Sequence, residues 1–222
     1  DDDGNASRTE QVPRNYHEAI RHPQCESYKK AMLDELESHN ENTTWKLVPI
    51  QAAKGRKLVG SVWVFDVKRN KDGSIKKYKA RLCAQGFSQI AGADYVHTFS
   101  NTIRHDTIRI LFAFAAKNAL ILTGADVKTA YLYGILKEII FMKPPQGHET
   151  YDENGNLLVC QLIKAIYGLR QSGERWEARL GGQLREMGMT RCDVDPCLWR
   201  RGDADQKTLV LVAHYVDDII VA

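Results

Sequence analysis

The chain has 222 residues, of which 43% are hydrophobic and 27% are charged, and its net charge at pH 7 is +3. This length and composition suffice for one sizeable core or two small subdomains, and the low net charge excludes a uniformly basic nucleic-acid-binding surface, although it allows local basic patches. No stretch approaches the roughly 18 apolar residues of a membrane-spanning helix and the N-terminus lacks a secretion signal, so we expect no membrane contact.

The five cysteines form no CxxC pair, a pattern that favours reduced thiols in the cytosol or nucleus. An alternative is a zinc site that uses Cys192, Cys197 and His214. The spacing of these three residues differs from that of the common zinc motifs, so the sequence disfavours this alternative.

The first part of the chain passes from a polar lead-in to regular structure. Residues 1–23 are polar and interrupted by prolines, and we expect them to be flexible. Between Pro23 and about His39, apolar residues recur at helical spacing and predict a helix. Residues 44–48 alternate between apolar and polar types, which predicts a strand.

Residues 61–69 and 75–84 alternate on either side of Asp72-Gly73, which is typical of a β-hairpin. A two-residue turn there places the apolar side chains on one face. The opposite face then collects four cations and one acid: Lys68, Lys77, Lys79, Arg81 and Asp66. Like charges opposite each other are unfavourable in a free hairpin, so one interpretation is a polyanionic ligand and the other is a solvated strand face.

A second helix is predicted from Asp106, as N-cap, to about Asn118. This helix is apolar nearly all round, so we expect it to be deeply packed. Strands are predicted at 138–142 and 157–162.

A third helix is predicted from Ser172, as N-cap, to about Met187. Its middle contains Gly181-Gly182, and each glycine weakens a helix by about 1 kcal/mol relative to alanine. We therefore expect a close packing contact at this pair.

The end of the chain carries two adjacent carboxylates. An apolar run at 209–212 leads to Asp217 and Asp218 and returns through 219–221, which predicts two strands and a tight turn that holds both aspartates. A second apolar strand ends in Asp126. Aspartate pairs are common in turns, but three carboxylates at one end of a sheet would suit two Mg²⁺ ions for phosphoryl transfer.

A series of short motifs follows one order along the chain. They are residues 42–48, 63–65 with 72–73, 78–82, 86–89, 98–100, 107–109, 126–132, 166–172 with 176, and 215–218. In these motifs the chain resembles the reverse transcriptase domain of Ty1/copia-type LTR retrotransposons, from about Tyr28 to the C-terminus. Tyr131 stands where that family more often has phenylalanine, a departure that leaves the carboxylates unaffected.

The resemblance implies an α+β right-hand polymerase fold, in which an antiparallel palm sheet packs on helices. After the lead-in at 1–23, it implies fingers at 24–100 and 134–171 and palm at 101–133 and 172–222. The chain ends at Ala222, shortly after Asp218. The resemblance thus implies that a thumb and an RNase H domain are missing, and we expect little processive synthesis from this chain alone.

Site residues are carried over from the family by position. Asp126, Asp217 and Asp218 become the catalytic ligands of two Mg²⁺ ions, for which Mn²⁺ can substitute, and the Val127 carbonyl becomes a further metal ligand. Tyr131 corresponds to the steric gate that rejects a ribose 2′-hydroxyl. The implied nucleotide-binding residues are Lys68, Lys79, Arg81, Ala130, Tyr131 and Gln171, and the implied nucleic-acid contacts are Lys77 and Tyr215. Arg69 and Lys71 compete with Lys68 for the fingertip position.

The implied function is RNA-directed DNA polymerisation, in which dNTPs extend a DNA or RNA primer on an RNA or DNA template. The resemblance also implies a parent polyprotein with an upstream integrase and a downstream RNase H, in cytoplasmic virus-like particles and in the nucleus. Two alternatives are a catalytically silent, truncated remnant and a nucleic-acid-binding module without chemistry.

Overall fold

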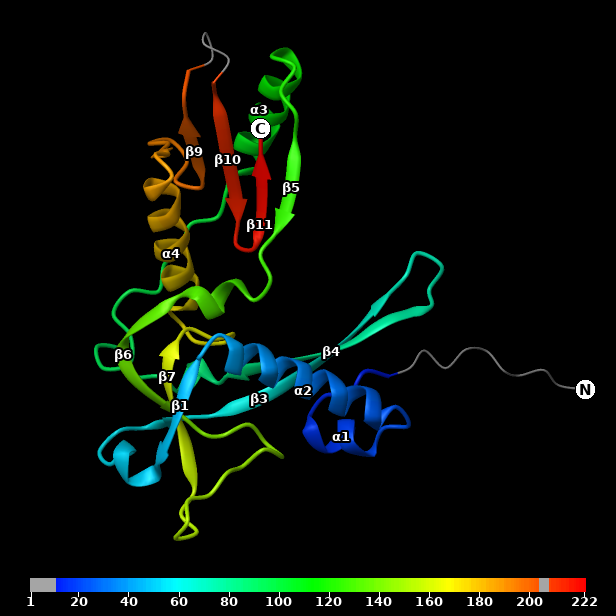
Figure 1. The fold of residues 1–222 in the computed structure, drawn as a ribbon, viewed down its shortest axis with the longest axis vertical. Coiled ribbons are helices and arrows are strands. Elements are labelled where there is room, and N and C mark those ends of the chain that lie inside the picture. Colours follow the sequence, from blue (N-terminus) through cyan, green and yellow to red (C-terminus); the bar gives the residue numbers. More distant parts are fainter. Residues whose placement is uncertain (1–10, 204–207) are drawn as a thin grey trace, which may run out of the picture. The chain divides into compact units, whose positions relative to one another are not determined.

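The computed structural model describes residues 11–203 and 208–222, which form a mixed α and β fold (Figure 1). The chain divides into two compact units. The first unit comprises residues 1–88 and 140–161, and the second comprises residues 89–139 and 162–222. Each unit therefore combines two separate segments of the chain, and each is described by itself below.

The first unit begins with helices α1 (Tyr16–Arg21) and α2 (Cys25–Glu41). The prediction of a flexible lead-in is wrong for α1, because the Asn15 side chain accepts a hydrogen bond from the Glu18 backbone N–H and caps this helix. Residues 1–10 of that prediction lie outside the described residues. Helix α2 confirms the second prediction, and β1 (Trp45–Pro49) confirms the strand after it.

Strands β3 (Ser61–Arg69) and β4 (Ile75–Ala84) form the predicted hairpin with the predicted register, so Lys68 faces Lys77 and Asp66 faces Lys79. The predicted two-residue turn is wrong. The register shifts after Lys68, and Asp72 accepts hydrogen bonds from the backbone N–H and the hydroxyl of Ser74. These local bonds stabilise a longer loop.

Helix α2 packs on the apolar side of this hairpin. Tyr28 is fully buried, and its ring makes edge contacts with the rings of Phe65 and Tyr78 at 5.4 and 5.0 Å between centroids. Aromatic contacts of this kind add to the stabilisation from buried area. The hairpin therefore buries one face and leaves its charged residues on the other.

A four-stranded sheet has the order β1-β7-β6-β2. Its strands β6 and β7 confirm the two predicted strands, although β6 begins earlier and β7 ends later than predicted. Strand β2 pairs with β6 in parallel. The 3₁₀ helix η1 (Ile50–Ala53) precedes β2. The bounds of the three strands are β2 (Leu58–Val59), β6 (Ile135–Met142) and β7 (Leu158–Lys164).

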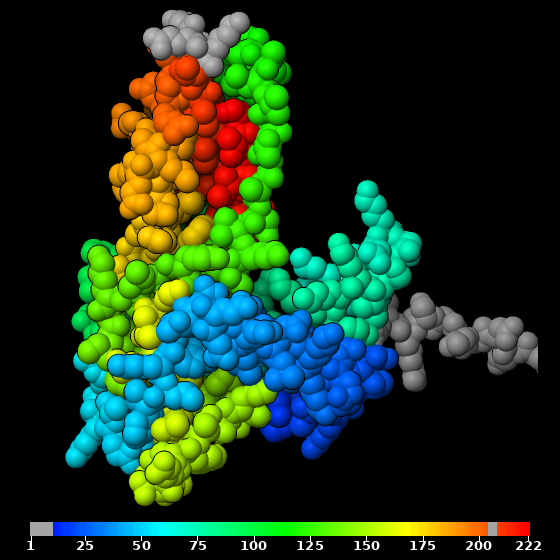
Figure 2. All heavy atoms as spheres, in the orientation of Figure 1, coloured from blue at the N-terminus to red at the C-terminus, as the bar shows by residue number. Residues whose placement is uncertain are grey.

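The second unit contains a five-stranded sheet with the order β5-β11-β10-β9-β8. All its paired strands are antiparallel, and helices α3 (His105–Lys117) and α4 (Ser172–Glu186) belong to the same unit. Figure 2 shows β11 in red between the green of β5 and the orange of the preceding strands. The strand bounds are β5 (Thr123–Asp126), β8 (Thr190–Arg191), β9 (Leu198–Arg201), β10 (Val210–Tyr215) and β11 (Asp218–Val221).

The two helices cover opposite faces of this sheet. Val212 of β10 belongs to a buried cluster with Trp176 of α4, whereas its neighbour Ala213 belongs to a cluster with Leu111 of α3. Successive strand residues point to opposite faces, so the sheet lies between α4 and α3.

Helix α3 differs from its prediction in two ways. Arg104 occupies the N-cap position without a side-chain bond, and Asp106 lies in the first turn. Leu111 is buried, but Ile110 is 68% exposed and Phe112 is 45% exposed. A sheet face covers only one side of a helix, so an apolar sequence all round does not lead to burial all round.

Helix α4 begins one residue earlier than the predicted N-cap implies. Ser172 is its first residue, Gln171 occupies the N-cap position without a side-chain cap, and the Ser172 hydroxyl donates to the Ile166 carbonyl. The close contact at the glycine pair is confirmed for Gly181, where an added Cβ would lie 3.3 Å from the Trp199 ring. A Cβ at Gly182 would meet nothing within 4 Å.

No helix within residues 11–203 and 208–222 is long and apolar enough to cross a membrane. The five cysteines are free thiols. Burial raises the pKa of the Cys160 thiol to about 12, so this thiol is protonated at neutral pH.

Candidate active site

The three aspartates lie at the same end of the five-stranded sheet. Asp218, the first residue of β11, is the Cα partner of Tyr215 in β10 and of Asp126 in β5. The backbone N–H of Val127 donates to the carbonyl of Asp217 at 2.8 Å. The predicted convergence of the three residues on one sheet end is therefore present in the backbone.

The turn itself differs from its prediction by one residue. It consists of Val216 and Asp217, and Asp218 already belongs to β11. Val216 has a φ angle of 54°, in the left-handed region that β-branched residues rarely adopt. Thr129, shortly after Asp126, has a φ of 53°. Backbone strain of this kind concentrates at functional sites.

Within the described residues, the three carboxylates have no cationic partner. The ion pairs found among residues 11–203 and 208–222 include none of Asp126, Asp217 and Asp218. Asp126 and Asp218 are exposed, and Asp217 is half-buried. Because like charges on directly opposed strand residues are destabilising, this sheet end carries a concentrated negative charge that a cation would offset.

The carboxylate side chains are not gathered around a common point. The part of the chain that the structure describes contains no group of three His, Cys, Asp or Glu side chains placed to hold a metal ion. Neither the three aspartates nor Cys192, Cys197 and His214 form such a group. Exposed carboxylates repel each other, which favours separated side chains even where the backbone brings their positions together.

Tyr131 lies beside the carboxylates in the 3₁₀ helix η3 (Ala130–Tyr133). Its ring meets Tyr167 edge-on, with 4.9 Å between centroids. Burial raises the pKa of the Tyr131 phenol, and the negative charge of Asp217 raises it further. The preceding Ala130 is 1% exposed, so a nucleotide contact at Ala130 would have to use its backbone.

Gln171 is fully buried in a hydrogen-bonded pair. Its side-chain oxygen accepts from the amide of Gln89 at 3.0 Å, and its own amide donates to the carbonyl of Asp94 at 2.7 Å. Gln89 also accepts from the backbone N–H of Arg170. Both ends of the Gln171 amide are thus used within the protein, and the nucleotide contact that we expected would require these bonds to break.

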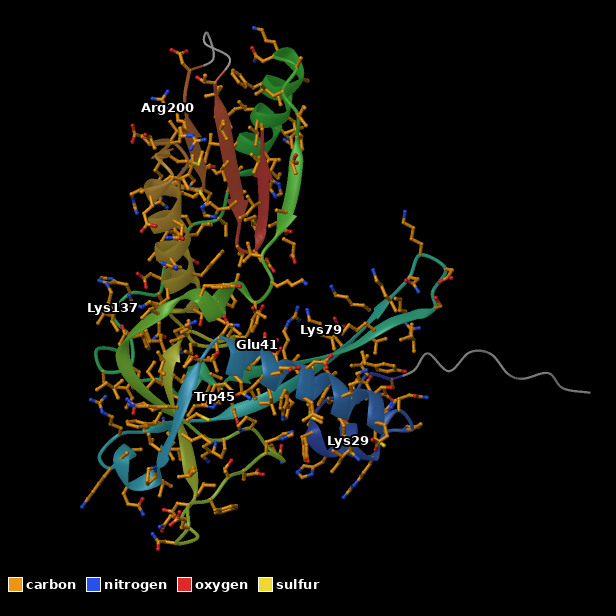
Figure 3. The ribbon with its side chains drawn as sticks, viewed as in Figure 1. Lys29, Glu41, Trp45, Lys79, Lys137 and Arg200 are labelled. Atoms are coloured by element: carbon orange, nitrogen blue, oxygen red, sulfur yellow. The ribbon has the colours of Figure 1, made fainter. Side chains whose placement is uncertain are left out.

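The basic face of the β3–β4 hairpin belongs to the first unit. Burial lowers the pKa of Lys79, and the charges of Arg81 and Lys68 lower it further, so these three cations are close together. Figure 3 labels Lys79 on this hairpin. Lys77 has an exposed ion pair with Asp34 at 3.5 Å.

Two further residues with an expected ligand contact, Arg69 and Tyr215, are both exposed. Arg69, at the tip of the hairpin, donates to the Gly73 carbonyl at 3.1 Å. Tyr215, next to the aspartates in the second unit, is 52% exposed and is accessible to a ligand.

Two neighbouring residues of α4 support the site and were not predicted to do so. The indole N–H of Trp176 donates to the carbonyl of Val216 at 2.7 Å. Arg175 is 7% exposed and forms ion pairs with Glu138 at 2.7 Å and with Glu174 at 3.3 Å. The sequence motif marks Trp176, but helical periodicity gives no signal that the arginine beside it is buried.

An apolar cleft of about 610 Å³ lies in the second unit, away from the aspartates. Its lining includes Ile110 and Phe114 of α3 and Leu198 and Leu211 of the sheet. None of the three aspartates lines it. The candidate site is therefore the end of the five-stranded sheet where the three aspartates lie, and not this cleft.

Comparison with known proteins relates the chain to retroelement polymerases. Residues 42–222 match the family described as reverse transcriptase (RNA-dependent DNA polymerase). The chain is 34% identical over 209 residues to the Retrovirus-related Pol polyprotein from transposon TNT 1-94 of Nicotiana tabacum, a match that covers 94% of this chain and 15% of that protein.

Two further relatives show the same pattern of coverage. The Pol polyprotein from transposon RE1 of Arabidopsis thaliana is 36% identical over 205 residues, covering 91% of this chain and 14% of that protein. The truncated transposon Ty1-A Gag-Pol polyprotein of Saccharomyces cerevisiae is 27% identical over 214 residues, covering 93% of this chain and 17% of that protein. The chain therefore spans only a small part of each relative's length.

Proposed function

Because the chain belongs to the reverse transcriptase (RNA-dependent DNA polymerase) family, as a domain of the Ty1/copia type, we propose that Asp126, Asp217 and Asp218 form its catalytic centre. The observation that carries this proposal is the direct pairing of Asp126 with Asp218 at the end of the sheet. The bond between Val127 and Asp217 brings the third aspartate to the same place. The reaction is the addition of a dNTP to a primer 3′-hydroxyl.

The donor set suits Mg²⁺, with Mn²⁺ as a substitute. Carboxylate and backbone carbonyl oxygens are the hard ligands that Mg²⁺ prefers, and the three aspartates have no cationic partner among the described residues. Asp126, Asp217, Asp218 and the Val127 carbonyl would hold the ions. When bound, a pair of divalent cations lowers the pKa of the attacking hydroxyl and offsets charge on the pyrophosphate leaving group.

The chain's other residues bind and select the nucleotide in this proposal. The cations Lys68, Lys79 and Arg81 neutralise triphosphate or nucleic-acid phosphate charge, with Lys77 beside them. The bulk of Tyr131 next to Asp217 leaves no room for a ribose 2′-hydroxyl. This assigns the β3–β4 hairpin to the fingers and the five-stranded sheet to the palm of a right-hand polymerase.

The proposed partners follow from the same family. An RNA or DNA template with an annealed primer would be the macromolecular substrate, and dNTPs would be the small-molecule substrate. The relatives are Pol and Gag-Pol polyproteins, so we place this chain in a polyprotein as well.

A single-nucleotide extension assay tests the proposal. A DNA primer annealed to an RNA template is incubated with dNTP and Mg²⁺, and the chain is compared with Asp218→Asn and with Asp193→Asn, a change to an exposed aspartate outside the site. We expect Asp218→Asn to lower the extension rate by at least about 10²-fold, as loss of one electrostatic group in an active site does. We expect Asp193→Asn to have no effect.

Two outcomes would contradict this reading. Extension that survives Asp218→Asn would remove the aspartates from the catalytic centre. Template-primer binding without extension, unaffected by chelation of divalent cations, would favour a nucleic-acid-binding module without chemistry.

A further inference from the structure

The two-residue turn before Asp218 is held by a donor on each of its carbonyls. The indole N–H of Trp176 donates to the carbonyl of Val216 at 2.7 Å. The backbone N–H of Val127 donates to the carbonyl of Asp217 at 2.8 Å. One donor comes from helix α4 and the other from the residue that follows Asp126, so the turn is connected to both.

The first of these donors is itself rigidly placed. Trp176 is 6% exposed and packs in a buried cluster with Leu180, Trp199 and Val212. The adjacent Arg175 is buried and forms an ion pair with Glu138 at 2.7 Å. These contacts anchor both residues, and they restrict movement of the Trp176 indole relative to the sheet.

The turn requires such support because of the conformation of Val216. Its φ angle is 54°, and a β-branched residue has a steric conflict in the left-handed region. Strained backbone persists only when its surroundings determine it strongly. The bond from Trp176 is the interaction that fixes the carbonyl of this same residue.

We propose that Trp176 is a positioning residue of the catalytic centre, which acts through the Val216 carbonyl to hold Asp217 and Asp218 in place beside Asp126. This inference rests on the proposed function, because the aspartates are its target. Displacement of a reacting group by about 1 Å can cost on the order of 10²-fold in rate. In this proposal, correct placement of the two aspartates requires the indole N–H of Trp176 and not only its ring.

The alternative is that Trp176 serves only as a core residue. Its ring fills space between α4 and the sheet, and any change that removes the ring would disturb folding. A variant that lacks the N–H but keeps the ring distinguishes the positioning role from the core-packing role. Replacement of Trp176 by β-(3-benzothienyl)alanine does this, because sulfur takes the place of the N–H in a ring of nearly the same shape.

The chain offers matched controls for this replacement. The indole nitrogen of Trp199 is buried, and no hydrogen-bond partner for it occurs among the described residues, so the same replacement there removes no bond. The indole N–H of Trp63 donates to the Gln146 carbonyl at 3.0 Å, within the first unit. Replacement at Trp63 therefore removes an equivalent bond that does not involve the turn.

Two measurements are made on the 222-residue chain and each variant. Hydrogen exchange of residues 210–222 reports opening of the turn, and electron paramagnetic resonance of Mn²⁺ reports metal affinity. We expect replacement at Trp176 to speed exchange in this segment and to weaken Mn²⁺ binding by about 5- to 10-fold, as loss of one hydrogen bond would. Both controls should keep the exchange and affinity of the unmodified chain.

The outcomes separate this inference from the proposed function. Unchanged exchange of residues 210–222 on replacement at Trp176, or an equal change on replacement at Trp63 or Trp199, would overturn the positioning role. Mn²⁺ binding that is insensitive to Asp218→Asn would refute the proposed metal site. In that case, faster exchange confined to the Trp176 variant would still establish that its N–H holds the turn.

Discussion

Asp126 and Asp218 are direct Cα partners on the antiparallel strands β5 and β11. Opposed residues of an antiparallel pair lie roughly 4.5–5.5 Å apart at Cα, so two negative charges share one end of the sheet without a neighbouring cation in the described part of the chain. Such a pair lowers stability in the absence of a ligand. Its presence is explained if the site binds cations, and the following predictions address the residues around it.

Tyr131 is predicted to select deoxyribonucleotides by its bulk. Changing Tyr131→Ala should raise ribonucleotide incorporation relative to deoxyribonucleotide incorporation by roughly 10- to 100-fold, which is the range that steric discrimination of a small group supplies. Tyr133→Ala is the matched control, since Tyr133 lies in the same 3₁₀ helix. The ratio of kcat/KM for the two nucleotides measures the effect, and an unchanged ratio for Tyr131→Ala would remove the gate assignment.

Lys79 is predicted to contact phosphate groups. Lys79→Ala should weaken template-primer binding and reduce the slope of log affinity against log salt by about 0.7–0.9, the value for one lost phosphate contact. Lys76 is exposed and has no partner in the hairpin register, so Lys76→Ala serves as the control. Titration over a series of salt concentrations gives both slopes, and equal slopes for the two variants would place nucleic acid elsewhere.

Gly181 and Gly182 are predicted to differ in their tolerance of alanine. Gly182→Ala should stabilise the protein by up to about 1 kcal/mol, because alanine favours the helix and its Cβ meets open space. At Gly181 the added Cβ would lie 3.3 Å from Trp199, which offsets this gain. Urea unfolding of both variants tests the prediction, and equal stabilisation would show that the Trp199 ring can move freely.

Asp195 is predicted to make folding stability depend on pH. Burial raises the pKa of this carboxyl, but hydrogen bonds from the Thr107 hydroxyl and from the backbone N–H groups of Arg104 and Cys197 outweigh burial and leave the pKa below its usual value. A lowered pKa means that the carboxylate stabilises the fold above the unfolded pKa of about 4 and loses this effect as the pH falls through the folded pKa.

Substitution of this residue tests the dependence. Asp195→Asn should cost about 1.5–3 kcal/mol in unfolding free energy at pH 7, because hydrogen bonds to a charged group are lost. The difference from the unmodified protein should shrink as the pH falls below about 4. Unfolding free energies measured from pH 7 to pH 3 decide this, and a difference that is independent of pH would contradict the assignment.

Several features follow from local sequence alone. The register of the β3–β4 hairpin was predicted by centring its turn on Asp72-Gly73, and the alternation of both strands agrees with it because Trp63, Phe65 and Leu82 are then buried on one face. Its loop was not predicted correctly. An Asp-Gly pair is compatible both with a two-residue turn and with a longer loop held by the Asp72 side chain, and the sequence does not distinguish the two. A packed contact at the Gly181-Gly182 pair was also predicted, because glycine in a helix otherwise only costs stability, but only Gly181 makes it.

The tertiary structure decided the features that depend on which segments meet. Asp126 and Asp218 each stand at a strand end in the sequence, but only the pairing of β5 with β11 makes them partners. Gln171 and Arg175 look like surface residues, yet partners distant in the chain, Gln89 and Glu138, satisfy their polar groups in the interior. A buried polar group is stable only when its partners are present, and periodicity within one segment carries no information about partners supplied by another.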